Sequence, residues 1–293
     1  MNSRPATNYD KKVTLLFDGD IVAYRAGFAA EKRVYHDERF PPKDGGKSFS
    51  LKKEALIEIP EEHLVWYREA EPLENALHNC SSLIENTIDY CSDYFDLDRE
   101  HISYLTYMTG NFETPNFRLA VDPEYKANRD PNHKPTHLGE IKVYLTTKHN
   151  GYLTEGCEAD DFFGQACITM KGRGVVPVIC TIDKDLQQLP GFHYNFTTGT
   201  IVEVEKERAS VVFWRQMLEG DRVDNITGIN GIGPVKASKL IPIGMSHEQA
   251  EKTVKEHYEK EFSEDWEAMY NKNCDLLWIW RKVPDTCPFK TKN

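Results

Sequence analysis

Acidic residues in four separate parts of the chain have the types and spacing that metal-dependent chemistry requires. They are Asp18; Glu158, Asp160 and Asp161; Asp183 and Asp185; and Asp221 and Asp224. Hard oxygen ligands in this number, with no His or Cys among them, select Mg²⁺ or Mn²⁺ over zinc. Two such ions held close together would activate a water molecule and stabilise the leaving oxygen of a phosphodiester. The pattern therefore predicts metal-dependent phosphodiester hydrolysis.

The densest acidic group stands at the start of a predicted helix. Glu158, Asp160 and Asp161 lead into an apolar stripe with helical spacing over residues 162–170. The first turn of a helix favours negative charge, because its N–H groups are unpaired. Crowded carboxylates nevertheless raise one another's pKa unless a cation binds them. The stretch is therefore either part of a metal site or a cluster that only caps the helix.

Two of the acidic groups follow apolar runs that are typical of buried parallel strands. Residues 13–17 end at Asp18, and residues 175–180 lead to Asp183 and Asp185. In parallel α/β sheets, ligands bind at the edge formed by the carboxyl ends of the strands. Asp221 and Asp224 are three positions apart, so they would face one way on a helical turn. We expect an α/β fold with a mostly parallel central sheet, flanked by helices, to bring these acids together.

The other expected elements follow from hydrophobic periodicity and turn residues. A strand is predicted at 102–108, with edge strands at 193–196 and 201–204. Helices are predicted at 21–30, 71–95, 138–149, 158–171 and 205–218, with a short helix at 184–189 and one or two more after 246. Residues 31–60 are polar and interrupted by Pro and Gly, which indicates a surface insertion such as a hairpin.

A basic and aromatic stretch lies between the second predicted strand and the acidic helix. Its Tyr125, Lys126 and Arg129 suit a site where phosphates meet cations and a base stacks on a ring. A solvated, charged loop is the alternative interpretation.

A glycine-rich turn at 228–236 opens a further helix. Gly231 and Gly233 would leave backbone N–H groups free to bind a phosphate, and Lys236 and Lys239 add positive charge. A Gly-x-Gly turn alone is weak evidence, but here it directly follows the acidic stretch at 220–225.

Composition limits the classes of partner. The 293 residues carry a net charge of -11, so any binding to nucleic acid must use local basic patches. Seven cysteines without metal-ligand spacing indicate reduced, buried thiols and a cytoplasmic location. Residues 1–12 lack the apolar core of a secretory signal, and no apolar run is long enough to span a membrane, so no membrane partner is expected.

Taken together, the motifs resemble those of the 5′-nucleases, the family of flap endonucleases, the polymerase I 5′-nuclease domain and phage 5′-to-3′ exonucleases. The phage exonucleases are the most similar. The motifs are FDGD and YRA near the N-terminus, FR and PEYKANRD, EGCEADD, TIDKDLQQL, and GDRVDNITGINGIGPVKA. The resemblance covers about residues 13–240, apart from 31–60. It implies a PIN-like catalytic α/β domain at 13–204 with an arch or clamp region at 117–150. It also implies a helix-hairpin-helix-like DNA-binding element with C-terminal helices at 205–293.

The resemblance implies a Mg²⁺-dependent 5′-to-3′ exonuclease with flap endonuclease and RNA-primer-removing activity, in phage-type DNA replication or recombination. Such an enzyme would work in the host cytoplasm if phage-encoded, on duplex DNA with a 5′ end or flap, or on RNA–DNA hybrids. Two metal ions would be held by Asp18, Glu158, Asp160, Asp161, Asp183, Asp185 and Asp221, directly or through water, with Asp224 in support. Lys126 and Arg129 would steady the scissile phosphate, and Tyr125 would stack on an end nucleotide. The expected duplex contacts are Gly231, Gly233, Lys236 and Lys239, with a potassium ion at the 228–236 hairpin and Arg25 as a further DNA contact.

One departure from the family pattern leaves one alternative open, and a match to another family provides a second. Thr109, Gly110 and Asn111 stand where the family usually has an Asp after the second strand, and Glu113 could substitute for it. A nuclease-like protein that binds DNA without cleaving it is therefore one alternative. A haloacid-dehalogenase-type phosphatase is the other, since Asp18-Gly19-Asp20 matches the nucleophile and acid–base pair of that family, but it leaves the remaining motifs without a role.

Overall fold

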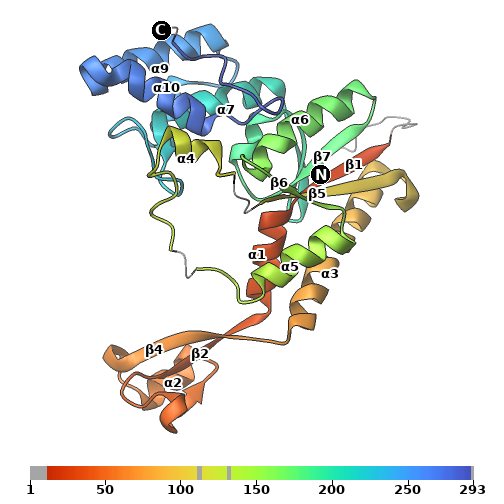
Figure 1. Ribbon diagram of the computed structural model, residues 1–293, viewed down its shortest axis with the longest axis vertical. Coiled ribbons are helices and arrows are strands. Elements are labelled where there is room, and N and C mark those ends of the chain that lie inside the picture. Colours follow the sequence, from red (N-terminus) through yellow and green to blue (C-terminus); the bar gives the residue numbers. More distant parts are fainter. Residues whose placement is uncertain (1–11, 111–113, 131–132, 292–293) are drawn as a thin grey trace.

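The computed structural model describes residues 12–110, 114–130 and 133–291. Its centre is a six-stranded sheet in the order β6-β5-β1-β7-β8-β9 (Figure 1). The strands are β1 (Val13–Asp18), β5 (Ile102–Thr109), β6 (Gly151–Thr154), β7 (Val176–Cys180), β8 (Gly191–Asn195) and β9 (Thr200–Val204). All neighbours pair in parallel except β8 and β9, which are antiparallel. The predicted α/β class is therefore confirmed.

Strand β1 lies in the middle of the sheet, and every one of its residues is buried. It pairs with β5 on one side and β7 on the other, with Asp18 opposite Tyr107 and Phe17 opposite Cys180. The ends of β1 and β7 are thus level. This register brings the acids that follow the two strands to the same edge.

Helices cover both faces of the sheet. The first face is covered by α1 (Gly19–Ala29), α3 (Leu73–Phe95) and α5 (Leu138–Lys148), which pack on one another. The opposite face is covered by α6 (Ala159–Gly172). Side chains of β1 alternate between the two layers: Leu15 and Phe17 join the core with α1 and α3, whereas Leu16 joins Phe163 of α6. This alternation is the period of a strand that is buried on both sides.

The insertion is longer than predicted and has a sheet of its own. It contains β2 (Glu31–Asp37), η1 (Pro42–Asp44), β3 (Ser48–Phe49), α2 (Lys52–Glu58), η2 (Glu61–His63) and β4 (Leu64–Ala70). The strand order is β3-β2-β4, and β4 pairs with β2 along its whole length. The insertion therefore ends at residue 70 instead of 60. Figure 1 shows it projecting from the body at the ends of α1 and α3.

The C-terminal part of the chain forms a second core. Its elements are α7 (Lys206–Glu219), β10 (Gly220–Asp221), β11 (Ile226–Thr227), α8 (Pro234–Leu240), α9 (His247–Phe262), η5 (Ser263–Asp265) and α10 (Trp266–Leu277). The buried side chains Trp214, Tyr258 and Tyr270 hold α7, α9 and α10 together. The short helix α4 (Phe117–Val121) packs on α10, so part of the predicted arch region belongs to this layer.

Several local predictions differ from the structure. Strand β6 was not predicted, and the helix expected at 184–189 is the single 3-10 turn η4 (Asp185–Gln188), while η3 (Arg99–His101) precedes β5. Residues 221–225 form the turn of the β10–β11 hairpin instead of a helical turn, with Asn225 at φ 60°. The seven cysteines are free and buried, as predicted. Within the described ranges, no helix combines the length and apolar character needed to cross a membrane.

Candidate metal and nucleic-acid site

Thr181 joins the acids at the ends of β1 and β7. Asp18 caps α1 by accepting a hydrogen bond from the Ile21 N–H at 3.1 Å. Its other oxygen accepts from the Thr181 hydroxyl at 2.7 Å, and that hydroxyl oxygen accepts from the Asp183 N–H at 2.9 Å. The strand ends are therefore linked by local hydrogen bonds that hold Asp18 and Asp183 in fixed positions.

Asp185 contributes a carboxylate oxygen without a hydrogen-bond partner. Its N–H donates to Asp183 at 2.8 Å, but its own Oδ1 is buried and unsatisfied within the described residues. A buried polar atom without a partner is costly and calls for an explanation. A bound cation would supply the missing interaction.

Five acids from three elements line a small cavity of about 30 Å³ beside these strand ends. They are Glu158 and Asp160 from the start of α6, Asp185 from η4, and Asp221 and Asp224 from the β10–β11 turn. The structure therefore brings together groups that are far apart in sequence. No three of them have ligand atoms within 4.8 Å of one another in the described part of the chain. The arrangement is wider than a cage for one ion.

Burial and mutual repulsion raise the pKa of four of the acids. Burial is the largest cause for each of them. The pKa of Asp18 rises to about 7 and that of Asp185 to about 8, with Asp20 and Asp183 as the respective main neighbouring charges. The pKa values of Asp160 and Asp183 are also raised, and Asp183 is the largest charge acting on Asp160. In this half of the site, burial and repulsion outweigh the attraction of Lys126 and Lys184.

The other half of the site is neutralised by side chains of the basic stretch. Although burial opposes the charge of Glu158, Lys126 and Arg118 lower its pKa. The Lys126 ammonium contacts Glu158 and lies 3.5 Å from Asp224, and Arg129 also pairs with Asp224. The predicted catalytic cations therefore lie at the carboxylates.

Tyr125 does not lie where its predicted role requires. Only 4% of the residue is exposed, and its hydroxyl lies 3.1 Å from Glu158 and 3.0 Å from Asp224. Burial, followed by the charge of Glu158, raises the pKa of this hydroxyl. A ring enclosed in this way cannot receive a base. The placement argues against nucleotide stacking and makes Tyr125 a positioning residue for the two acids.

Asp161 is also separated from the other predicted metal ligands. Its two oxygens accept hydrogen bonds from the Arg118 guanidinium at 2.7 and 3.0 Å, and both side chains are buried. Asp161 also accepts from the N–H groups of Glu158 and Trp280. Since a buried arginine already balances its charge, this placement argues against Asp161 as a metal ligand.

Arg118 has a structural role that the sequence interpretation missed. Besides pairing with Asp161, it donates to the carbonyl oxygens of Leu276 and Trp278 at 2.9 and 3.1 Å. It thereby joins α4, α6 and the end of α10. An arginine inside the otherwise apolar run 117–121 was the available signal, because such a side chain needs a buried acidic partner.

The position of the absent family Asp is filled by a different network. The Thr109 hydroxyl accepts from the Ala159 N–H at 3.2 Å, and the Thr109 N–H donates to Asp20 at 2.8 Å. Asp20 pairs with Lys142 at 2.6 Å. Thr109 therefore ties β5 to α6, and Glu113, the predicted substitute, lies outside the described residues.

The predicted duplex-binding turn lies beside the acids. Residues 219–223 and 225–234, together with Lys184, line a depression of about 860 Å³. Gly220 and Gly228 allow the hairpin strands to meet closely, since a Cβ on Gly220 would lie 2.3 Å from the Gly228 nitrogen. Lys236 donates to the Gly231 carbonyl at 2.7 Å.

The other predicted DNA contacts lie on the surface. Gly233 is the N-cap of α8, and Lys239 is exposed in its last turn. Arg25 is exposed on α1 and lies 3.4 Å from the Thr197 hydroxyl and the Phe196 carbonyl.

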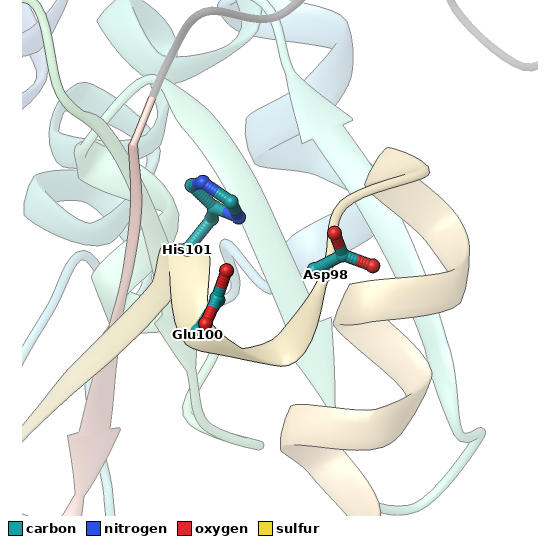
Figure 2. Close-up of side chains that lie close together, drawn as sticks. All are labelled: Asp98, Glu100 and His101. Atoms are coloured by element: carbon teal, nitrogen blue, oxygen red, sulfur yellow. The ribbon is translucent and has the colours of Figure 1, made fainter.

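A separate group of potential ligands lies at the opposite end of β5. Asp98, Glu100 and His101 have ligand atoms within 4.8 Å of one another, and all three are exposed (Figure 2). They occupy the turn before β5, whereas the acids described above gather where the strands end. This group is not part of the predicted metal site.

Comparison with known proteins identifies relatives with nuclease names. The flap endonuclease Xni of Shewanella pealeana is 32% identical over 139 residues, which cover 43% of this chain and 54% of that protein. The 5′-3′ exonuclease of Mycoplasma pneumoniae is 27% identical over 251 residues, covering 78% and 72%. The chain spans about half the length of the Shewanella protein and a smaller share of related DNA polymerases I. No protein-family model matches the chain.

A solved structure supports the same relationship at the level of the fold. The bacteriophage T5 D15 flap endonuclease, in a pseudo-enzyme–product complex with DNA and metal ions, superposes with a TM-score of 0.53 at 15% identity. The match covers 91% of this chain and 89% of that one. The chain is related to the 5′-nucleases. The predicted 5′-nuclease resemblance and fold are confirmed.

The raised pKa values predict how the stability of this 5′-nuclease relative depends on pH. Asp18 and Asp185 bind a proton more tightly in the folded state than in the unfolded chain. The resulting stabilisation is complete below the unfolded pKa and is lost as the pH rises through about 7 and about 8. The Tm in EDTA should therefore fall between about pH 5 and pH 8. Asp185→Asn should raise the Tm more at about pH 8 than at about pH 5. An equal change in Tm at the two pH values, measured by calorimetry, would contradict this prediction.

The buried ion pair generates a second prediction. Arg118→Met should lower the free energy of unfolding by about 3–5 kcal/mol, because Asp161 would remain buried without a partner. The double variant Arg118→Met/Asp161→Leu should recover most of this loss. Urea unfolding measures the free energy of unfolding of both variants.

Calorimetric titration with Mg²⁺ tests whether Asp161 binds metal. The Asp161→Asn variant should bind Mg²⁺ with the affinity of the wild type, and a large loss of Mg²⁺ affinity would restore Asp161 as a ligand.

Proposed function

We propose that the chain is a divalent-metal-dependent 5′-to-3′ nuclease that hydrolyses phosphodiesters in duplex DNA bearing a 5′ end or flap. One observation carries this proposal: acids from four parts of the chain meet at the carboxyl edge of the sheet, and burial raises the pKa of several of them. Lys126 and Arg129 lie at the same place. The relatives named as exonucleases and flap endonucleases support this activity.

The donor set fits Mg²⁺ or Mn²⁺. It consists of oxygen atoms, burial and then neighbouring carboxylates raise the pKa of Asp18, Asp160, Asp183 and Asp185, and the Asp185 Oδ1 has no hydrogen-bond partner among the described residues. The ligands would be Asp18, Asp160, Asp183, Asp185 and Asp221, with Glu158 and Asp224 in support. Their spread suits two ions, which when bound would activate water and stabilise the leaving oxygen.

The remaining residues would position the substrate. Lys126 and Arg129 are long cations that now contact Glu158 and Asp224, and a scissile phosphate would compete for them. The 228–236 turn would hold the duplex through Gly231, Gly233, Lys236 and Lys239, with Arg25 as a further contact. The proposal also includes a potassium ion at this hairpin and RNA–DNA hybrids as substrates. It further includes removal of RNA primers and a cytoplasmic role in phage-type replication or recombination.

A nuclease-like protein that only binds DNA is the second candidate. The observation in its favour is Thr109, which occupies the place of the family Asp and makes only structural hydrogen bonds. The phosphatase alternative has no support from the relatives, and Asp20, its acid–base residue, is held by Lys142 and the Thr109 N–H.

Cleavage of end-labelled DNA separates the first two candidates. Blunt and 5′-flapped duplexes, labelled at either the 5′ or the 3′ end, are incubated with and without Mg²⁺. Metal-dependent release of short products from the 5′ end is expected, and the flap-to-blunt ratio reports on the arch. Binding without cleavage in both Mg²⁺ and Mn²⁺ would instead identify a non-catalytic binder.

Asp183→Ala tests the metal assignment directly. It should abolish cleavage, because Asp183 lies between Asp18 and Asp185 in the hydrogen-bonded strand ends. Duplex binding, measured by fluorescence anisotropy, should remain. Thr200→Ala on β9, outside the site, is the control and should cleave normally. Unchanged cleavage by Asp183→Ala would refute the assignment.

Lys236→Ala tests the duplex-binding turn. It should weaken duplex binding and reduce the slope of log K against log salt by about 0.9, the value for one phosphate contact. The exposed Lys260 at the end of α9 offers a matched control, whose alanine variant should keep the full slope. The same slope in both variants would count against a role of the turn in binding DNA.

A further inference from the structure

The insertion presents a face of basic and aromatic side chains. Alternation along β2 and β4, with Arg33 opposite Arg68 and Tyr35 opposite Trp66, puts these four residues on one face of its sheet. Trp66 is 46% exposed although it is the largest type of apolar side chain. The Arg33 guanidinium lies 4.8 Å from the centre of its ring. Within the described residues, Arg33 has no carboxylate partner. We call these four residues the strand face.

The strand face is joined to α1 through stacked groups. The Arg68 guanidinium lies between two rings, 5.9 Å from that of Trp66 and 4.1 Å from that of Phe28 on α1. The Phe28 ring is in turn 5.9 Å from Tyr24, one turn nearer the metal site, and 5.3 Å from His133. Rings and guanidinium groups thus form an unbroken series from α1 to the insertion.

This series begins at the proposed metal site. Helix α1 starts directly after Asp18, and Figure 1 shows it running from the central sheet to the insertion. Tyr24 is near enough to Asp20 and Arg129 for both charges to act on its hydroxyl. A strand leaving the carboxylates along α1 would meet Tyr24, then Phe28, then the strand face.

The base of the insertion is held in register with the basic stretch. The Thr136 N–H donates to Glu31 at 2.6 Å, and His137 hydrogen bonds to the Glu71 carbonyl at 2.8 Å. Glu31 is the first residue of β2, and Glu71 directly follows the paired strand β4. The base of the insertion is therefore tied to residues 136 and 137, directly before α5.

We propose that the strand face, together with Phe28 and Tyr24, is a subsite for a single-stranded arm of the nucleic-acid substrate as it leaves the metal site. Bases would stack on the rings, and phosphates would pair with Arg33 and Arg68. This proposal rests on the proposed nuclease function in one respect: that function identifies the duplex from which the single-stranded arm extends. Single-strand binding itself does not depend on that function.

Charge and continuity favour nucleic acid over a protein partner. The exposed Trp66 ring lies next to Arg33, and the two acids on the same side of the sheet lie beside arginines. Glu31 is 3.6 Å from Arg68, and Asp37 pairs with Arg39. A net charge of -11 makes such a local basic surface necessary for any polyanion. A protein-docking face would not need to continue along α1 to the carboxylates.

Binding of oligothymidylates of increasing length, in EDTA to prevent cleavage, tests the proposal. Fluorescence anisotropy should show roughly tenfold weaker binding for Trp66→Ala, the effect of losing one stacked base. Arg33→Ala should reduce the salt slope by about 0.7, as for one phosphate of a single strand. Binding should quench tryptophan fluorescence. Trp66→Phe should lose most of this quenching while it keeps most of the affinity, which a purely structural role would not produce.

The opposite face of the same strands offers matched controls. Tyr67→Ala removes a ring that is 40% exposed on β4, and Lys32→Ala removes an exposed cation from β2. Both should bind oligothymidylate like the wild type. Duplexes with a single-stranded 5′ or 3′ arm then show which strand gains affinity from Trp66.

Two results would overturn the proposal. One is that Trp66→Ala, Tyr67→Ala and the wild type bind oligothymidylate equally while the Tm of both variants is unchanged. This would indicate that the strand face binds a protein partner. The other is affinity that depends on Trp66 equally for blunt duplexes and for single strands. Normal cleavage of blunt duplex by the same variants would show that the subsite, and not the proposed nuclease function, had failed.

Discussion

The repulsion among buried carboxylates at the carboxyl edge of the sheet is the constraint on which the rest of this structure depends. Hydrophobic packing of β1 between two helical layers places Asp18 at this edge, and the parallel register places Asp183 beside it. Burial makes the charged state unfavourable, so the pKa values of Asp18 and Asp185 rise toward neutrality. Such a site costs stability in the free protein and gains it when a cation binds.

Nearby cations balance the negative charge of the acids unequally, and this divides the site into two halves. Glu158 and Asp224 receive Lys126, Arg129 and the Tyr125 hydroxyl, so they are ion-paired within the chain. Within the described residues, Asp18 and Asp183 accept hydrogen bonds from hydroxyl and N–H groups, and neither they nor Asp185 form an ion pair. We infer that the compensated half orients substrate-binding cations, while the uncompensated half provides the affinity for metal.

The buried Arg118–Asp161 pair connects this site to the C-terminal core. Arg118 also holds carbonyl oxygens at the end of α10, so the first turn of α6 is joined to the layer that contains α7 and α9. A fully buried ion pair fixes geometry more than it adds stability. Its role here is to hold the first turn of α6 in a constant position against the end of α10.

The sequence by itself determined five of the six strands of the central sheet, the carboxylate edge and the relationship to the 5′-nucleases. These features depend on local signals: apolar runs that end in acids, a helical stripe after residue 158, and motifs in a fixed order. A buried strand such as β1 can be recognised without its neighbours, because all of its residues except Thr14 are apolar until the acid that ends it.

Only the tertiary structure decided which polar groups pair. Asp160 and Asp161 are adjacent in sequence, yet one lines the cavity and the other faces Arg118, because consecutive residues of a helix point about 100° apart. Tyr125 was expected to contact a nucleotide, but the distant Asp224 lies within hydrogen-bonding distance of its hydroxyl. The extent of the insertion also depended on a long-range feature, the pairing of β4 with β2. Such contacts depend on groups brought together from separate parts of the chain, which local periodicity does not encode.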